Sequence, residues 1–489
     1  MVKNLKQKAV SGMIWTALRR YSMMSIQFIS GIILARLLTP YDYGCIGMLT
    51  IFMSLSSTFI DAGFGSALIQ KKRPTQEDYS TIFFWNMGVA TLMYAILYFS
   101  APAIGRFYEI PLLSSVLRVQ AVVLFINAFN LVQLNQLKKN LNFKIISIVT
   151  IVTSVIALSV TIAMAYNGYG VWSLVTQHII VALIPAVVFW FYLKWKPIWT
   201  FSWASFKELF SFGFYMPLTH FVNELGKQLQ GLLIGKLFSP STLGYYSKAA
   251  GLERIASNTI SSVITNVTYP LYAEAQDDKA FLGNMIKKLT MVISYLTFPL
   301  MFLLMLLAKP LFVLLYSTRW LPSVIYFQVL CLVGITACLQ AINMQSIAAI
   351  GKSKQMFLWT LFKRTLGSGA MIAGLFIYGM KGFLVGVVFY NFLCYFVNIG
   401  LVSKYIGYKW TMQLIDLIPV TTVSVLALVA GYTSTYFLNL NMYVEAVIEL
   451  AVYLTVYLGW SLIFNPDAFK YFKSILLPRL KRSKKRLLQ

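Results

Sequence analysis

Long apolar stretches separated by short polar connections run through the whole chain. About 20 mostly apolar residues suffice for a helix to cross a membrane. The pattern therefore predicts an all-α polytopic membrane protein with fourteen spans, at 9–37, 41–69, 80–104, 113–136, 144–166, 169–193, 206–238, 241–271, 285–308, 323–350, 355–379, 382–403, 413–437 and 441–464.

One short sequence occurs twice. Gly31–Gly44 reads GIILARLLTPYDYG, and Gly231–Gly244 reads GLLIGKLFSPSTLG. Each copy is interpreted as the end of one apolar helix, a tight turn at proline and the start of the next helix. A duplicated helical hairpin is typical of two-lobed transporters. It predicts an N-lobe of six spans at 1–200, a C-lobe of six at 201–410, an extra pair at 411–465 and a basic tail at 466–489.

Composition supports a membrane protein. The chain is 58% hydrophobic and 11% charged, whereas soluble proteins average about 25% charged residues. The connections are too short for an extramembrane domain. This excludes a polymerase with a large periplasmic loop and a glycosyltransferase with a cytosolic sugar-nucleotide domain. A membrane enzyme of prenyl-linked sugar metabolism needs clustered acids or a nucleophile dyad, and the sequence has neither.

The net charge of +26 follows membrane topology and does not indicate nucleic-acid binding. Basic residues cluster in every second connection, as the positive-inside rule describes. The alternation predicts that the N- and C-termini are both cytoplasmic. The first span is too long for the apolar region of a cleavable signal peptide.

Ionisable residues inside the expected spans are the candidate functional residues, because a charge facing lipid is costly. The cations exceed the acids, which predicts a cationic cavity and an anionic substrate. The candidates for binding an anionic head group are Arg19, Arg20, Lys227, Lys248 and Arg254. Alternatives stay open: Glu224 with Lys227 could form an internal ion pair, and Lys363 and Arg364 could lie near the membrane surface.

No metal site, catalytic group or cofactor is expected. The four cysteines, Cys45, Cys331, Cys338 and Cys394, lie in apolar stretches and are interpreted as small hydrophobic residues. His178 is interpreted as a hydrogen-bonded packing residue, and His220 as either a packing or a functional residue.

The N-terminal region resembles the polysaccharide transporters of the MOP (multidrug/oligosaccharidyl-lipid/polysaccharide) superfamily, which include the Wzx-type flippases. The resemblance covers Ser11–Lys72 and is strongest at LARLLTPYDYG (Leu34–Gly44) and DAGFGSALIQ (Asp61–Gln70). It implies two helical bundles forming a V around a central cavity, with spans 1, 2, 7 and 8 lining it.

The resemblance also implies a function: a flippase that moves an undecaprenyl-pyrophosphate-linked oligosaccharide, an O-antigen, capsule or exopolysaccharide unit, to the periplasmic leaflet by alternating access. H⁺ or Na⁺ coupling is expected at Asp61, Glu224 and Glu253. Expected partners are membrane lipid and a polysaccharide polymerase. A lipid II flippase and a multidrug exporter of the same superfamily remain alternatives, although the cationic set suits the mostly cationic drugs poorly. A non-transporting scaffold fits the buried charges less well.

Overall fold

The computed structural model describes residues 2–61, 64–213, 215–275, 277–438, 440–464, 466–471 and 473. The side chains of residues 209–223 and of Lys227 lie outside the described part, as do a few others in the helices. Within the described residues every regular element is helical, which confirms the predicted all-α class. Contacts divide the chain into two compact units, residues 1–247 (unit 1) and 248–489 (unit 2). The expected lobe boundaries at residues 200 and 410 rest on the repeat and stay a prediction.

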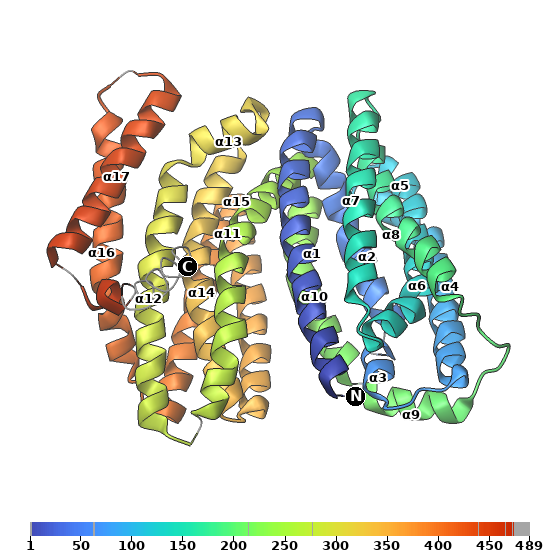
Figure 1. Cartoon of the computed structure of the whole chain (residues 1–489). Helices are drawn as coiled ribbons and strands as arrows, with labels where there is room; N and C mark the ends of the chain where they lie inside the picture. The colour runs from blue at the N-terminus through green and yellow to red at the C-terminus, as the bar shows by residue number, and fades with distance from the viewer. Residues whose placement is uncertain are drawn as a thin grey trace, which may run out of the picture. The chain divides into compact units, whose positions relative to one another are not determined.

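Unit 1 is a bundle of long helices with short helices at its ends (Figure 1). The α7 helix packs against α1 and α8, α6 packs against α4 and α8, and α10 packs against α2. The helices are α1 (Val2–Leu37), α2 (Pro40–Asp61), α3 (Phe64–Gln70), α4 (Gln76–Phe107), α5 (Leu112–Gln120), α6 (Val122–Lys139), α7 (Phe143–Tyr166), α8 (Val171–Leu193), α9 (Trp203–Gly213), α10 (Tyr215–Leu237) and the first turns of α11 (Pro240–Glu274).

A charged cluster fixes the short helices of unit 1. The Lys71 ammonium lies 3.0 Å from the Asp78 carboxylate on α4 and 2.9 Å from that of Glu208 on α9. Partial burial works against the charged form of Lys71, but the hydrogen bonds to Glu208 and Asp78 outweigh it and raise the pKa of Lys71. Asp78 also closes a capping box with Thr75 at the start of α4. The connection between α3 and α4 and the sequence-distant helix α9 therefore meet at one end of the unit.

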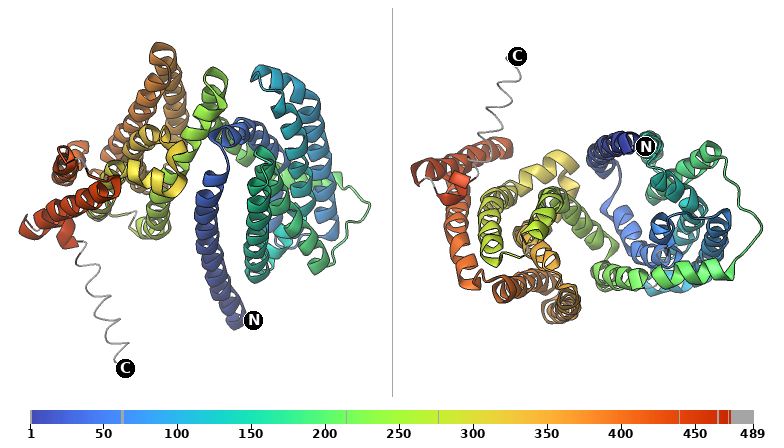
Figure 2. Two further views of the ribbon diagram at one scale, coloured as in Figure 1. Left: turned by 90° about the horizontal axis from the view of Figure 1, so that it is seen from above. Right: turned by 60° about the horizontal axis from the view of Figure 1, so that its bottom comes forward.

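Unit 2 contains the rest of α11 and the helices that follow it (Figure 2). In this unit α14 packs against α12 and α15, and α16 packs against α12 and α17. The elements are α12 (Lys279–Leu306), α13 (Ala308–Tyr316), the 3₁₀ turn η1 (Thr318–Trp320), α14 (Ser323–Ala349), α15 (Ser353–Ile406), α16 (Trp410–Thr435) and α17 (Met442–Phe464).

The α15 segment is two helices joined by a sharp turn. Its backbone leaves the helical conformation at Tyr378 and Gly379, where Gly379 has a φ of +60° that glycine adopts readily. The two halves touch at Gly374 and Gly382, because a Cβ on either glycine would overlap the carbonyl of the other. The break falls on the last two residues of the span expected at 355–379, just before the span expected at 382–403.

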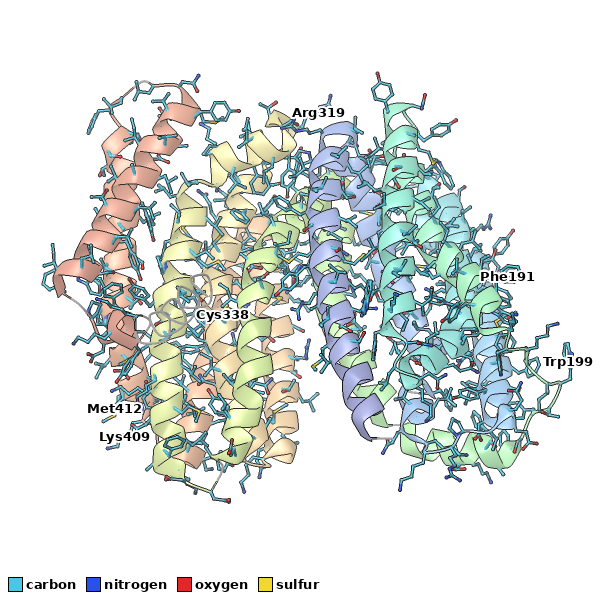
Figure 3. The ribbon with its side chains drawn as sticks, in the orientation of Figure 1. Phe191, Trp199, Arg319, Cys338, Lys409 and Met412 are labelled. Atoms are coloured by element: carbon cyan, nitrogen blue, oxygen red, sulfur yellow. The ribbon has the colours of Figure 1, made fainter. Side chains whose placement is uncertain are left out.

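Ten segments of the described chain are long and apolar enough to cross a membrane, with the whole of Leu358–Ile406 counted as one. Their outward residues include Phe191, which is 79% exposed on the surface of unit 1 (Figure 3). The long helices α1, α10 and α11 are outside this set, and they carry most of the candidate charges. The count of fourteen spans stays a prediction.

Candidate functional site

The two copies of the repeated turn meet face to face in unit 1. A Cβ on Gly44 would overlap the carbonyl of Pro240, and a Cβ on Gly244 would overlap the carbonyl of Pro40. The contact is reciprocal, as expected for two copies related by an approximate two-fold axis. Glycine at both positions therefore allows two backbones to touch where no side chain would fit.

Local capping builds each of these turns in the same way. Thr39 precedes α2; its hydroxyl accepts from the backbone N–H of Asp42 at 3.3 Å and donates to the Asp42 carboxylate at 2.6 Å. Ser239 precedes α11 and accepts from the backbone N–H of Thr242 at 3.1 Å. A hydroxyl residue at the N-cap followed by proline at the first helical position is a strong helix start. Both α2 and α11 thus begin at their repeated proline, which places the two glycines one turn later.

Small residues let α10 lie close along α2. A Cβ on Gly235 of α10 would come within 2.9 Å of the Met48 side chain of α2. On the same helix, a Cβ on Gly47 would come within 3.1 Å of Leu243 in the first turn of α11. Further along the pair, the Gln228 side-chain amide donates to the Ser54 hydroxyl at 3.3 Å. Close approach through small residues is a common way for membrane helices to associate. The α2–α10 pair therefore extends from the touching turns towards the middle of both helices.

Arg19 and Arg20, expected to act together, lie in different surroundings on α1. This helix packs on α7 through Gly12, Trp15 and Met23; for example, the Ser147 hydroxyl donates to the Trp15 carbonyl at 2.9 Å. Arg19 follows the same helical spacing and is half-buried, whereas Arg20 is exposed. Within the described residues neither arginine forms a hydrogen bond or ion pair.

The candidate cations of α11 also differ from each other. The Lys248 ammonium lies 4.7 Å from the ring centre of Tyr316 and 5.6 Å from that of Trp320, as in cation–π contacts. Arg254 is exposed, and its Nε donates to the Ala250 carbonyl at 3.0 Å. The side chain of Lys227 lies outside the described side chains, as does that of His220. Among the candidate cations whose side chains are described, Arg20 and Arg254 are therefore the exposed ones.

Glu253 is the most buried of the candidate acids, at 6% exposure. It lies against Gly334 of α14, where an added Cβ would come within 2.6 Å of its Oε1 and 2.9 Å of the Met301 sulfur. Within the described part of the chain, Oε1 has no hydrogen-bond partner. Glycine at 334 thus leaves the room that this carboxyl occupies.

The other two candidate acids belong to unit 1. Asp61 is exposed at the end of α2. A Cβ on Gly65 would come within 3.2 Å of its Oδ1 and within 2.9 Å of the Asn135 side chain. Glu224 is half-buried on α10. In the described residues no three acid, histidine or cysteine side chains gather as a metal site would require. Each acid is therefore a separate candidate for ion coupling.

Lys363 is buried, a position that the sequence left open. Lys363 is 6% exposed and donates to the Asn398 side chain at 2.7 Å, joining the two halves of α15. One alternative from the sequence placed Lys363 near the membrane surface. Its spacing alone could not show the burial, because the amide that faces it lies 35 residues later on the second half of α15.

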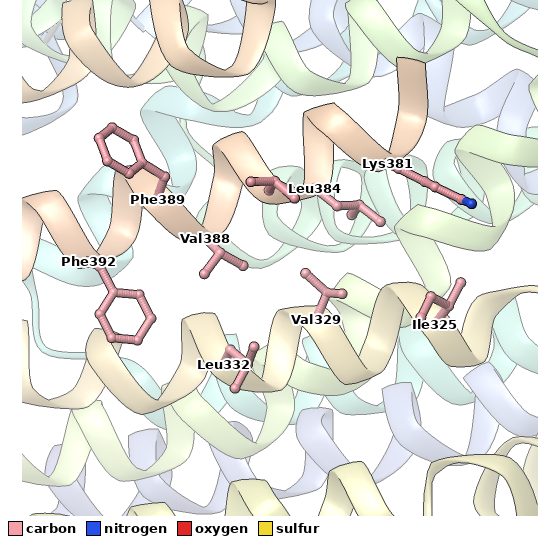
Figure 4. A pocket seen from close by; sticks show the side chains of 9 residues that line it. Ile325, Val329, Leu332, Lys381, Leu384, Val388, Phe389 and Phe392 are labelled. Carbon is pink, nitrogen blue, oxygen red and sulfur yellow. The ribbon is translucent and has the colours of Figure 1, made fainter. Parts of the chain in front are cut away.

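An apolar groove lies between α14 and the second half of α15 in unit 2 (Figure 4). Its volume is about 630 Å³, and its walls are aliphatic and aromatic side chains with Lys381 near one end. Val385 and Phe389 on this groove are 68% and 58% exposed. A hollow of this composition suits hydrocarbon and not a sugar or pyrophosphate, so it is no part of a head-group site.

A second, smaller hollow in unit 1 is polar. It has a volume of about 320 Å³ and lies between α2, the α5–α6 segment and α8. His178 lines it, and its Nδ1 lies 3.2 Å from the side-chain amide of Gln120. The expected hydrogen bond of His178 is present, but this histidine faces a hollow and is not enclosed by packing.

Comparison with known protein families gives a match over residues 33–325, more than half of the chain, to the family described as "Polysaccharide biosynthesis protein". The chain belongs to this family. The match includes the first turn at Pro40, the second at Pro240 and Glu253. The resemblance expected from the N-terminal residues is confirmed.

Several bacterial proteins are similar over most of their length. The teichuronic acid biosynthesis protein TuaB of Bacillus subtilis is 24% identical over 358 residues, 73% of this chain and 74% of that protein. The succinoglycan biosynthesis transport protein ExoT of Rhizobium meliloti is 23% identical over 407 residues, 83% and 80% of the two chains. The lipopolysaccharide biosynthesis protein WzxC of Escherichia coli is 21% identical over 402 residues, 81% and 82%.

Solved structures show the same fold. The lipid II flippase MurJ in an inward closed conformation matches with a TM-score of 0.72 and 15% identity, covering 93% of this chain and 98% of MurJ. An inward-facing multidrug resistance transporter of the MATE family, from the MOP superfamily, matches with a TM-score of 0.62 and 14% identity, covering 81% and 98%. The chain therefore has the fold of these two solved structures, as the resemblance implied.

Proposed function

We propose that the chain is a flippase for an undecaprenyl-pyrophosphate-linked oligosaccharide, moving it from the cytoplasmic to the periplasmic leaflet of a bacterial inner membrane. The observation that carries this is the placement of ionisable residues on α1, α10 and α11, in a chain whose other long helices are apolar. The relatives named for teichuronic acid, succinoglycan and lipopolysaccharide biosynthesis support a saccharide cargo.

The head group binds to cations in this proposal, and the prenyl chain stays in lipid. Arg20 and Arg254 are exposed and present guanidinium groups, which pair with phosphate through two parallel hydrogen bonds. Arg19, Lys227 and Lys248 complete the proposed binding set. A multidrug exporter is less well supported, because this set would repel cationic drugs. The fold likeness to MurJ leaves lipid II as a second candidate cargo with the same kind of head group.

Alternating access requires that the touching turns separate. The reciprocal contact of Gly44 with Pro240 and Gly244 with Pro40 seals one end of the α2–α10 pair. On the proposed topology this contact lies at the periplasmic end of the pair. Release of the saccharide would then require these two turns to move apart. No catalytic step and no cofactor is part of the proposal; H⁺ or Na⁺ at Glu253, Asp61 or Glu224 would supply the driving force.

Replacement of Arg19 and Arg20 together by alanine tests the head-group site. We expect export of the surface polysaccharide to fall at least tenfold while the level of membrane-inserted protein is unchanged, because two charges that bind the pyrophosphate are lost. The matched control is Lys72→Ala with Arg73→Ala, two adjacent exposed basic residues in a connection. Normal export by the Arg19/Arg20 variant would refute the assignment of these residues.

A further inference from the structure

The polar hollow of unit 1 has features that the head-group site does not use. It is lined by five polar residues, Ser54, Ser57, Gln120, Asn127 and His178, and otherwise by aliphatic side chains and Met53. We call this hollow the amide pocket. None of its lining residues is an acid, a lysine or an arginine. A pyrophosphate would therefore lack its usual cationic partners there, and a metal ion would find a single histidine and no carboxylate.

The amide pocket lies at the depth of the membrane interior. Its polar residues are seven to seventeen positions from the N-terminal ends of their spans, about 10–26 Å along the helices, against a hydrocarbon core of about 30 Å. Ser57, Asn127 and His178 are exposed on its surface. Polar groups left open to hydrocarbon are unfavourable. We therefore expect them to face a hydrated space.

Gln120 points to a ligand for this space. Its side chain is 4% exposed; its amide donates to the Nδ1 of His178 at 3.2 Å, and its Oε1 has no partner within the described residues. A buried acceptor left without a donor is unfavourable. Because Nδ1 of His178 accepts this bond, its other ring nitrogen carries the hydrogen and can donate. The acceptor of Gln120 and the donor of His178 therefore belong to two hydrogen-bonded residues that both line the pocket.

The remaining polar residues extend this pattern. The Ser57 hydroxyl donates to the Ser54 carbonyl at 2.8 Å and keeps its oxygen lone pairs for a ligand. The exposed Asn127 adds one amide oxygen and one NH₂ group. Val123, Leu124 and Val181 supply apolar surface between them. Alternating neutral donors and acceptors beside aliphatic patches complement a ring that carries hydroxyls on its edge and C–H groups on its faces.

We propose that the amide pocket binds one neutral sugar ring of the transported saccharide. This proposal rests on the proposed flippase function and adds a saccharide subsite to it. The volume of about 320 Å³ is at the lower end of the roughly 300–1,000 Å³ typical of small-ligand sites, which suits a single ring and not a whole repeat unit. The rest of the saccharide would lie outside the pocket.

Thiol labelling of the purified full-length chain tests the subsite directly. Ser57→Cys places a reactive group in the pocket, while the four native cysteines are buried. A polar methanethiosulfonate reagent is applied with and without free hexoses and 6-deoxyhexoses at about 100 mM. We expect at least one sugar to slow labelling threefold or more, and Asn127→Leu in the same background to remove this protection. Ser159→Cys, an exposed position of α7 outside the pocket, should show none.

Flipping in proteoliposomes separates the failure of this proposal from failure of the flippase function. We expect Asn127→Leu to reduce flipping of a lipid-linked oligosaccharide at least fivefold, with Asn140→Leu, an exposed position at the end of α6, at the parental rate. If no sugar protects the Ser57→Cys variant and Asn127→Leu flips at the full rate, the subsite is overturned and the flippase is left intact. A parent chain that flips nothing would instead overturn the function.

Discussion

At the scale of single residues, Glu253 shows how a glycine creates the space for a buried acid. The carboxyl lies against Gly334, in room that an alanine there would fill. The sequence identified Glu253 as an ionisable residue within a span. It did not identify Gly334 as its neighbour, because α11 and α14 come together only in the folded chain. Likewise, the half-buried position of Arg19 and the exposed one of Arg20 follow from the packing of α1 on α7.

Glu253→Gln should remove the dependence of flipping on an ion gradient. The amide keeps the shape of the side chain but can neither release a proton nor carry the charge that attracts a cation. We expect the rate of flipping in proteoliposomes to become at least threefold less responsive to imposed H⁺ and Na⁺ gradients. Glu449→Gln is the matched control, since this half-buried acid of α17 accepts a hydrogen bond from Thr435. A parent chain indifferent to both gradients would contradict the coupling role.

At the scale of elements, the sequence revealed the repeated turn and its helix starts but not the contact between its two copies. The four identical positions Gly31/Gly231, Leu37/Leu237, Pro40/Pro240 and Gly44/Gly244 were visible, and the helix starts at Pro40 and Pro240 follow from capping chemistry. The direct contact of the two turns did not follow, although glycine at the same place in both copies was a usable signal. A residue that must lack a Cβ in each copy indicates that something approaches it closely.

Gly244→Ala should open the contact between the turns. The new Cβ would overlap the Pro40 carbonyl, and a backbone carbonyl cannot move aside as a flexible side chain can. Native Cys45 is fully buried beside Gly44 and reports on the opening. We expect its labelling by a polar thiol reagent, followed by peptide mass spectrometry, to rise at least fivefold. Gly88→Ala, where a Cβ meets nothing, should leave Cys45 unreactive; equal labelling of both variants would refute the tight contact.

At the scale of the whole molecule, the sequence predicted the class of protein and much of its helix pattern. Alternating apolar and basic segments suffice for this, because a membrane imposes helix length and loop charge directly. The hollows could not be predicted in this way. Gln120, Asn127 and His178 come from α5, α6 and α8. The spacing of residues within one helix does not predict which residues of a different helix lie opposite.

The proposed topology places both termini in the cytoplasm. We expect a green fluorescent protein fused after Gln489 to fluoresce, since this reporter folds poorly when exported through the membrane unfolded. Alkaline phosphatase fused at Lys309, in a connection with few basic residues, should be active because that enzyme matures in the periplasm. The reverse pattern of the two reporters would contradict the assigned orientation and place the touching turns at the cytoplasmic end.

Reconstitution tests the flippase account most directly. The purified chain in proteoliposomes is given a fluorescent polyprenyl-pyrophosphate-linked oligosaccharide, and flipping is read from the fraction quenched by a membrane-impermeant reductant. The account predicts that flipping exceeds that of protein-free vesicles at least tenfold, falls with the Arg19/Arg20 double alanine variant, and does not extend to a cationic dye. Flipping no faster than in protein-free vesicles, or transport of the dye alone, would contradict it.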